Sequence, residues 1–393
     1  MKIISDVKKI DELLSRGVAE AIDRDDLRKK LLSGQKLRVK LGIDPTSSNI
    51  HLGRSVPLLK LRDFQELGHQ IIFIIGDFTG TIGDTSDKTS ERPMLDEATI
   101  KHNIKNYVDQ AKKIIDIKKC EVHYNGDWLR KLKYEEICRQ ANIFSINEFI
   151  SRENISRRLE AGSRVSLREV LYPLMQGYDS VMVKADVEIG GTDQKFNLLA
   201  GREMQRYYQQ TPQNIITNPI IEGLDGRKMS SSWGNTVNLL DSAKDMFGKI
   251  MSLRDESIID YFTLLTRLDL AEINDFKSAL ANGANPRDYK IRLAKEIVRF
   301  YFSETEALAQ EDNFIKTFSH KEVPEEIEEF KPHAYDLVSI LVEAKLVNSK
   351  SDARRVIEQG GVKINQVVEK DPGAQVHSGA VIQKGKINFL KIV

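Results

Sequence analysis

LRVKLGIDPTSSNIHLGRSVPLLKLRDFQELGHQIIFII, residues 37–75, is the stretch that decides the fold. Its first part, 37–43, alternates like a strand, and its last part, 70–75, is an apolar run typical of strands in parallel sheets covered on both faces. Between them, the apolar spacing predicts a helix from Leu52 to about Leu67, which Gly68 ends. Strand, crossover helix and strand form a βαβ unit. The stretch therefore predicts an α/β domain with a parallel sheet, whose ligands bind beyond the carboxyl ends of the strands.

The bulk composition sets broad limits. The chain has 393 residues, 40% of them hydrophobic and 30% charged, which suits a globular protein at about 100–200 residues per domain. The net charge of +1 excludes a polycation, so any nucleic-acid binding must come from local patches. Cys120 and Cys138 have neither metal-ligand spacing nor a disulfide framework, so we expect no metal site and a reducing, cytoplasmic compartment. The N-terminus lacks the apolar core of a secretory signal.

Further helices and strands follow along the chain. Ser166 and Glu169 have the spacing of a capping box, which predicts a helix that reaches about Val183. Asn285 followed by Pro286 is typical of a helix start. We also expect helix-prone residues at 5–33, a helix at 95–117, strands at 186–189 and 214–217 with a helix to about 208 between them, and helices throughout 236–317.

These patterns predict three domains. The first, 1–220, is the sheet domain, with several short helices near 127–163 as an insertion. The second, 221–320, combines a polar loop with an all-helical segment. An acidic stretch at 303–330 precedes the third domain, 331–393, a small α+β unit with ten Lys and Arg against six Asp and Glu.

One candidate site lies where the first strand meets its helix. His51, Gly53 and Arg54 stand at the helix N-terminus, where unpaired N–H groups and a partial positive charge attract phosphate. Gly53 allows a close approach of ligand to backbone, and an imidazole with a guanidinium could neutralise charge that develops on phosphate groups. Asp44 and Asp77 follow the two strands at the same edge of the sheet.

Several motifs together carry a family resemblance. Residues 42–54 resemble the first signature of class I aminoacyl-tRNA synthetases, and residues 77–92 are similar to the loop that follows the second strand in tyrosyl-tRNA synthetases. Residues 190–194 (GGTDQ) and 228–232 (KMSSS) match later motifs of that family in order and spacing. The last sixty residues resemble the alpha-L RNA-binding motif of bacterial tyrosyl enzymes. The resemblance covers nearly the whole chain.

The resemblance implies a fold and a reaction. The fold is a Rossmann-like parallel-sheet catalytic domain, an all-helical middle domain on the anticodon side, and a small α+β C-terminal RNA-binding domain. The reaction joins L-tyrosine to ATP as tyrosyl-adenylate and then transfers it to the 3′ end of tRNA(Tyr), with release of pyrophosphate and AMP. Such chemistry needs positioning and charge neutralisation. Mg²⁺ accompanies ATP, without a tightly bound cofactor, and the insertion near 127–163 makes a homodimer contact.

The resemblance assigns the phosphate contacts to two loops and a helix start. Lys228 carries the charge that meets pyrophosphate, on a polar loop that glycines on both sides leave able to close over ATP. Lys88 and Arg92 belong to a second clamp after Asp84. The implied catalytic residues are His51, Arg54, Lys88, Arg92, Lys228 and Ser231, and the implied ATP-binding residues are Asp44, Thr46, His51, Gly53, Gly191, Asp193, Lys228, Met229 and Ser231.

Specificity for the amino acid is predicted on one helix face. Tyr172, Gln176 and Asp179 fall on the same side of the helix by their spacing. By resemblance, Asp179 accepts the phenol proton of the substrate, Tyr172, Gln176 and Asp84 surround its ammonium group, and Gln194 lines the same pocket. A site built to bond a hydroxyl rejects the analogue that lacks it.

Three residues depart from the commonest pattern of the family. Arg54 stands in place of a second His, and it cannot lose its charge. Ser231 stands in place of a second Lys, which removes one cation from the closing loop. Lys40 stands where one branch has a Tyr that touches the substrate phenol, and this sequence resembles a second bacterial branch that has Lys there. We expect Lys40 to point away from the pocket.

The C-terminal domain supplies the expected RNA contacts. Lys350, Arg354 and Arg355 lie on a predicted helix that starts near Ser349, and Lys363 follows a glycine turn into a strand. These four cations could meet phosphates of tRNA.

Two alternatives stay open at this point. A tryptophanyl-tRNA synthetase shares the sheet and both nucleotide motifs, although the C-terminal domain and the Tyr172–Asp179 face argue against it. An RNA-binding protein that has lost catalysis would account for Arg54 and Ser231. Exchange of pyrophosphate into ATP with each amino acid separates the three hypotheses.

Overall fold

The computed structural model describes residues 2–84, 94–319, 327–385 and 388–393. The chain divides into two compact units, 1–307 and 308–393, and each is described by itself. Within the described residues, no helix is both long enough and apolar enough to cross a bilayer.

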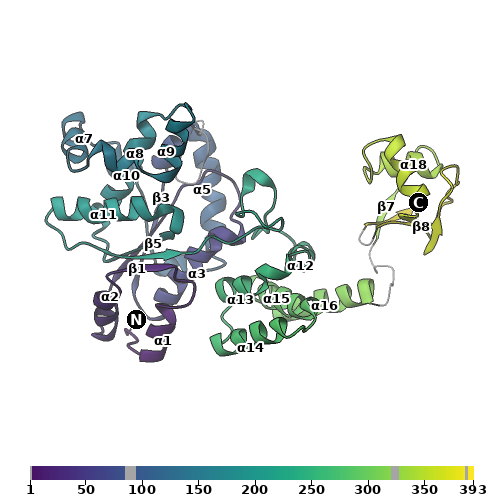
Figure 1. Ribbon diagram of the computed structural model, residues 1–393, viewed down its shortest axis with the longest axis horizontal. Helices are drawn as coiled ribbons and strands as arrows, with labels where there is room; N and C mark the ends of the chain where they lie inside the picture. The colour runs from purple at the N-terminus through teal and green to yellow at the C-terminus, as the bar shows by residue number, and fades with distance from the viewer. Residues whose placement is uncertain (1, 85–93, 320–326, 386–387) are drawn as a thin grey trace. The chain divides into compact units, whose positions relative to one another are not determined.

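The first unit is built on a six-stranded sheet in the order β1-β6-β5-β2-β3-β4 (Figure 1). All neighbouring strands are parallel except β1, which pairs antiparallel with β6. The strands are β1 (Glu20–Ile22), β2 (Arg38–Ile43), β3 (Gln70–Ile75), β4 (Glu121–Tyr124), β5 (Val187–Gly191) and β6 (Asn214–Asn218). The predicted parallel α/β sheet is therefore confirmed.

Helices cover both faces of this sheet. α3 (Leu52–Glu66) packs on β2, β3 and β5, and it ends just before Gly68 as the sequence predicts. α11 (Lys195–Tyr207) packs on β5 and β6, and α10 (Leu167–Val183) lies beside α11 on the opposite side of the sheet from α3 (Figure 1). α10 begins with the predicted capping box between Ser166 and Glu169.

Several elements differ from the sequence-based expectation. The helix-prone segment 5–33 contains α1 (Val7–Leu13) and α2 (Arg24–Leu32), but the short edge strand β1 lies between them. Three residues in a charged segment are too few to give a readable alternation. The helix expected at 95–117 is shorter, because α5 (Glu97–Ala111) ends before a 3₁₀ turn, η1 (Ile117–Lys119), that leads into β4. β4 was not expected from the sequence.

The remaining helices of the first unit follow the expected pattern. The insertion consists of short helices, namely α6 (Gly126–Leu129), α7 (Tyr134–Ala141), α8 (Ile146–Ile150) and α9 (Glu153–Glu160), and α4 (Thr79–Ile82) follows β3. After β6 come η3 (Ser231–Trp233), α12 (Ala243–Met251), η4 (Asp255–Ser257), α13 (Ile258–Leu265), α14 (Leu270–Ala281) and α15 (Pro286–Tyr301). α16 (Glu304–Ser319) begins in the first unit and continues into the second, which starts at Leu308. The Asn285 side chain accepts from the Arg287 N–H, so the predicted cap of α15 is confirmed.

The second unit is a small α+β domain, as predicted. Its five-stranded sheet has the order β7-β11-β10-β8-β9, with β7 (Glu328–Phe330), β8 (Val362–Ile364), β9 (Val367–Glu369), β10 (Val381–Lys384) and β11 (Asn388–Ile392). α17 (Leu337–Glu343) and α18 (Lys350–Glu358) pack together, and Leu337, Ile340, Ile357 and Ile382 belong to one buried apolar core.

Candidate functional site

A cavity of about 520 Å³ lies where the strand order of the large sheet reverses, between β2 and β5. Side chains beyond the carboxyl ends of β2, β3 and β5 line it, which is where open α/β sheets bind ligands. The structure brings together there most of the predicted site residues, namely Asp44, Thr46, His51, Gly53, Arg54, Asp84, Tyr172, Gln176, Asp179, Gly191, Asp193, Gln194, Lys228, Met229 and Ser231. Lys88 and Arg92 lie outside the described residues.

Asp179 is the most deeply buried carboxylate of the cavity wall. It is 3% exposed, and its two oxygens accept from Trp128 Nε1 at 2.8 Å and from Asn125 Nδ2 at 3.2 Å. Burial raises the pKa of Asp179 to about 7, against the opposing effects of Lys40, Trp128 and Asn125. The group can therefore change its charge near neutral pH at the wall of the cavity.

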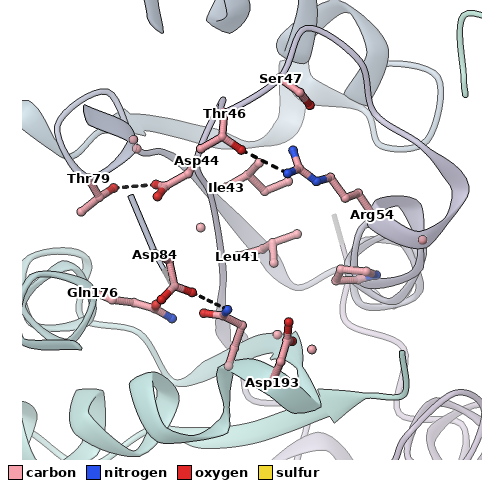
Figure 2. A pocket seen from close by; sticks show the side chains of 18 of the residues that line it. Leu41, Ile43, Asp44, Thr46, Ser47, Arg54, Thr79, Asp84, Gln176 and Asp193 are labelled. Atoms are coloured by element: carbon pink, nitrogen blue, oxygen red, sulfur yellow. Dashed lines mark hydrogen bonds between the residues drawn. The ribbon is translucent and has the colours of Figure 1, made fainter. Parts of the chain in front are cut away.

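Asp44 links two sides of the cavity. Its Oδ1 accepts from Thr79 Oγ1 at 2.7 Å, and its Oδ2 accepts from the Tyr172 hydroxyl at 2.8 Å (Figure 2 shows the bond to Thr79). A Cβ on Gly76 would come 2.0 Å from Asp44 Oδ1, so this bonding arrangement requires glycine at the end of β3. Burial and the neighbouring Asp44 charge raise the pKa of Tyr172 well above its usual range, which keeps its phenol protonated.

Asn125 joins these two clusters. Its Nδ2 donates to Thr79 Oγ1 at 2.8 Å as well as to Asp179, and its Oδ1 accepts from the Phe78 N–H at 3.1 Å. A continuous hydrogen-bonded chain therefore runs from Asp179 through Asn125 and Thr79 to Asp44. Such a connected network holds its members in fixed positions.

Asp84 and Gln194 meet across the cavity. Gln194 Nε2 donates to Asp84 Oδ2 at 2.6 Å, and Gln194 Oε1 accepts from Asn197 Nδ2 at 3.0 Å. Figure 2 shows Asp84 close to Gln176. The structure thus groups an acidic and two amide side chains on the side opposite Arg54.

Lys40 is not among the described residues that line the cavity, in keeping with the expectation that it points away from the pocket. Its Nζ donates to the Gln176 carbonyl at 3.0 Å and to Ser180 Oγ at 2.8 Å, and it lies 2.8 Å from Glu188 Oε1. Lys40 therefore contacts α10, the helix that carries Gln176 and Asp179, from the sheet side and outside the cavity.

The residues predicted to contact phosphate lie at the start of α3. His51 is the N-cap residue, and the N–H of Gly53 points to Met229 Sδ at 3.2 Å, which joins the helix start to the loop after β6. Arg54 Nη2 donates to Thr46 Oγ1 at 3.2 Å, as Figure 2 shows, and its Nη1 donates to the Tyr107 hydroxyl. The guanidinium is therefore oriented by two hydroxyl groups at the cavity rim.

The loop with Lys228 folds against this helix start. Lys228 Nζ donates to Asp193 Oδ2 at 2.9 Å, so two predicted ATP-binding residues form an ion pair here. The buried Asn235 braces the loop, because its Oδ1 accepts from the Ser230 N–H at 2.9 Å and its Nδ2 donates to Asp225 Oδ1 at 2.7 Å. Ser231 is exposed at the rim of the cavity.

Sequence reasoning missed three polar side chains of this site. Thr79, Asn125 and Trp128 contact Asp44 or Asp179, and none of them stood out in the sequence. An Asn directly after β4 is a detectable signal only once β4 itself is recognised. Among the described residues, no group of three or more His, Cys, Asp or Glu side chains is arranged to hold a metal ion.

The predicted RNA contacts belong to the second unit. Lys350, Arg354 and Arg355 are exposed on α18, and Lys363 is half-buried on β8. Arg355 pairs with Asp352 on its own helix. Within the second unit, three of these cations lie on α18, beginning at its first residue, and the fourth lies on β8, the strand that follows.

The fold and the cavity together define a class I tRNA synthetase. Residues 32–319 match the family of tRNA synthetases class I (W and Y), and residues 337–382 match the S4 domain. The chain is 44% identical to the tyrosine–tRNA ligase of Dehalococcoides mccartyi, over 98% of each chain, and 44% identical to that of Moorella thermoacetica, over 100% of this chain and 97% of the relative. The chain belongs to the tyrosine–tRNA ligase family.

Solved structures agree at the level of the fold. A tyrosyl-tRNA synthetase from Archaeoglobus fulgidus, complexed with L-tyrosine, superposes with a TM-score of 0.62 at 22% identity, over 78% of this chain and 100% of that chain. A truncated mitochondrial tyrosyl-tRNA synthetase from Aspergillus nidulans gives 0.65 at 21% identity, over 79% and 94%. At such identity, the likeness concerns the fold alone.

Proposed function

We propose that this chain is a tyrosine–tRNA ligase that converts L-tyrosine and ATP to tyrosyl-adenylate and pyrophosphate, and then esterifies the 3′ end of tRNA(Tyr) with release of AMP. The observation that carries the proposal is a single cavity with two chemically different ends. Buried acceptors, Asp179 above all, lie at one end, and the His51 imidazole lies at the other with the cations of Arg54 and Lys228.

At the amino-acid end, Asp179 accepts the phenol proton of tyrosine. Trp128 and Asn125 hold the carboxylate in place by donating to its two oxygens. Phenylalanine would leave this buried acceptor without its partner, and tyrosyl-tRNA synthetases are themselves a known example of such discrimination. Tyrosine therefore binds with its ring between α10 and the ends of the strands.

The substrate ammonium faces the polar groups nearer the centre of the cavity. Asp84 supplies a carboxylate, and Gln176 and Tyr172 supply neutral acceptors around it. The phenol of Tyr172 stays protonated and donates to Asp44, so its lone pairs remain directed to the cavity. This arrangement turns the tyrosine carboxylate toward the nucleotide.

At the phosphate end, catalysis is a matter of charge and position. The tyrosine carboxylate is already ionised and attacks the α-phosphorus of ATP, and the bond from this phosphorus to the pyrophosphate oxygen breaks. Negative charge moves onto pyrophosphate, where Lys228 and the start of α3 stabilise it. Lys228 exchanges its bond to Asp193 for this contact, which frees Asp193 for the ribose hydroxyls. Backbone near Leu224 and Met229 flanks the adenosine.

Mg²⁺ fits this site as a companion of ATP. The described groups at the phosphate end include the cations of Arg54 and Lys228 and serine hydroxyls, which suit phosphate oxygens. A divalent ion with few protein ligands is usual where phosphates coordinate it. When bound, the ion neutralises phosphate charge. Lys88 and Arg92 would add cations from the loop after Asp84.

The partners follow from two other surfaces. Lys350, Arg354, Arg355 and Lys363 would contact phosphates of tRNA(Tyr) in the cytoplasm. The insertion would form the homodimer contact, since it exposes apolar side chains that a monomer does not need, namely Tyr134 (83%), Ile146 (56%) and Leu159 (46%). Sedimentation equilibrium tests the dimer, and a monomer at micromolar concentration would refute it.

The decisive experiment is pyrophosphate exchange into ATP with each of the amino acids in turn. We expect exchange with tyrosine and none with phenylalanine. Exchange with tryptophan alone would indicate the sister specificity of the family. Absence of exchange with every amino acid, in folded protein that still binds tRNA, would indicate an RNA-binding protein without catalysis.

A further inference from the structure

Lys40 and Glu188 form an ion pair inside the large sheet. β2 and β5 are parallel neighbours, and these two residues are register partners, so their side chains leave the same face of the sheet. The side chains are 0% and 1% exposed, and Nζ lies 2.8 Å from Oε1. Removal of two charges from water is expensive, and an apolar pair would hold a helix to a sheet equally well. Stability of the fold therefore does not explain why two charged side chains, Lys40 and Glu188, are buried here.

The pair bonds to one turn of α10. Lys40 Nζ donates to the Gln176 carbonyl at 3.0 Å and to Ser180 Oγ at 2.8 Å, and Ser180 Oγ donates to Glu188 Oε2 at 3.0 Å. These bonds bracket the turn from Gln176 to Ser180. Asp179 belongs to this turn, so its backbone is anchored from both ends.

The pair also orients a side chain of the cavity wall. Gln176 Nε2 donates to Glu188 Oε1 at 3.1 Å, and Gln213 donates to Oε2. A Cβ on Gly201 of α11 would lie 2.6 Å from Gln213 Nε2 and 3.3 Å from Glu188 Oε2, so α11 leaves room for this cluster only with glycine there. The Gln176 amide is thereby held with its nitrogen toward the sheet, which leaves its oxygen for the cavity.

We propose that Lys40 and Glu188 act together as a positioning unit of the amino-acid pocket, in which Glu188 orients the Gln176 amide and Lys40 anchors the turn that carries Asp179. The inference rests on the proposed tyrosine-activating function. Neither side chain is among the described residues that line the cavity, so both act through Gln176 and Asp179 and not by contact with substrate.

The two charges also act on Asp179 in opposite directions. The Lys40 ammonium lowers the pKa of Asp179, and the Glu188 carboxylate raises it, while burial exerts the largest effect. The titratable groups that face Asp179 are Lys40 on β2, Glu188 on β5 and Tyr172 on α10 itself. The uncharged donors Asn125 and Trp128 bond to it directly. Asp44 is linked to it indirectly, because Thr79 donates to Asp44 and accepts from Asn125. An apolar pair could not supply such a balance.

The test compares Lys40→Met, Glu188→Gln and the double variant in tyrosine-dependent pyrophosphate exchange between pH 6 and pH 9. We expect each single variant to raise the KM for tyrosine about tenfold with the KM for ATP nearly unchanged. The acid limb of kcat/KM should move up by about one pH unit in Lys40→Met, move down in Glu188→Gln, and return close to the wild-type position in the double variant.

Lys60→Met is the matched control. Lys60 is also buried, on α3, and its Nζ donates to the Leu13 carbonyl at 2.7 Å, away from the cavity lining. We expect this variant to lower the melting temperature and to leave both the tyrosine KM and the acid limb in place. If a single variant of the pair fails to fold, the double variant, which leaves no unpaired buried charge, and Glu188→Asp carry the test. Glu188→Asp keeps the charge and withdraws the acceptor, so it should raise the tyrosine KM.

The outcomes distinguish failure of the positioning role from failure of the proposed function. The positioning role would be overturned if the acid limb of kcat/KM moved in the same direction in both single variants or did not move at all. It would also be overturned if Lys60→Met produced the same change. An unchanged tyrosine KM in Glu188→Asp would do the same. A wild-type protein that exchanges no pyrophosphate with tyrosine would overturn the proposed function and this inference with it.

Discussion

The amino-acid end and the phosphate end of the cavity are built in different ways. At the amino-acid end, Asp179, Asn125 and Thr79 are each at most 3% exposed and bond to one another. Asp179 lies on α10, Asn125 comes directly after β4, and Thr79 is the first residue of α4, which follows β3. At the phosphate end, Lys228 is half-buried and Ser231 is exposed, on a loop that is braced from one side by Asn235.

The difference follows from what each end has to do. Recognition of one hydroxyl demands acceptors that cannot shift, and a connected network on helices and strand ends supplies them. Pyrophosphate has to be held while charge develops and then released, which a loop can do by closing and opening. Rigid elements therefore carry the specificity, and the mobile part of the phosphate chemistry belongs to a loop that folds against the start of α3.

The largest expected effect comes from the rigid end. Asp179→Ala should reduce tyrosine-dependent pyrophosphate exchange by at least about a thousandfold, because it removes the phenol acceptor and leaves the Trp128 and Asn125 donors without a partner. Circular dichroism should remain that of the folded protein. The control is Tyr178→Phe, the neighbouring residue of α10, which packs against Tyr208 and not on the cavity. Exchange near the wild-type rate in Asp179→Ala would refute the pocket assignment.

The next effect belongs to the loop and should have a different kinetic form. Lys228→Ala should lower kcat for exchange by about a hundredfold to a thousandfold with little change in the KM for tyrosine, as expected for a contact made in the transition state. The control is Arg227→Ala, because that neighbouring cation pairs with Asp225 and stacks on Trp233. A rise in tyrosine KM without loss of kcat would break the contrast between the two ends.

The sequence predicted the two ends unequally for physical reasons. The shared face of Tyr172, Gln176 and Asp179 follows from helical spacing, which is the same whatever the helix packs against. The bonds of Asp179 to Asn125 and Trp128 depend on β4, a strand of four residues whose pattern was too short to recognise. The parallel sheet followed from long apolar runs, whereas the edge strand β1 depends on pairing with the distant β6.

The phosphate end was predicted through motif resemblance and not through periodicity. A loop has no repeating pattern, so its residues could be assigned a role but not a contact. The pairing of Lys228 with Asp193 joins residues 35 positions apart, and no local pattern reveals it. The ion pair of Lys40 with Glu188 is hidden in the same way, since strand register decides it.

A change of pH should reveal the rigid end without any mutation. Because burial raises the pKa of Asp179 to about 7, its carboxylate is protonated below that pH and then loses its capacity to accept the phenol proton. We expect kcat/KM for tyrosine to fall by about tenfold from pH 8 to pH 6. The KM for ATP over the same range is the internal comparison. A flat profile for tyrosine would mean that Asp179 is ionised throughout.

The smallest effect should come from a cation added to the loop. Ser231→Lys places a positive charge at the exposed rim of the cavity, where the family resemblance expects a second lysine. The added charge should stabilise the departing pyrophosphate, but solvent screens an exposed group, so we expect kcat for exchange to rise only severalfold, by about two- to fivefold. Ser232→Lys, one position further along, controls for charge alone. Equal gains in kcat in both variants would mean that the phosphate end responds to net charge alone. A gain confined to Ser231→Lys would mean that the loop positions its cations as strictly as α10 positions Asp179.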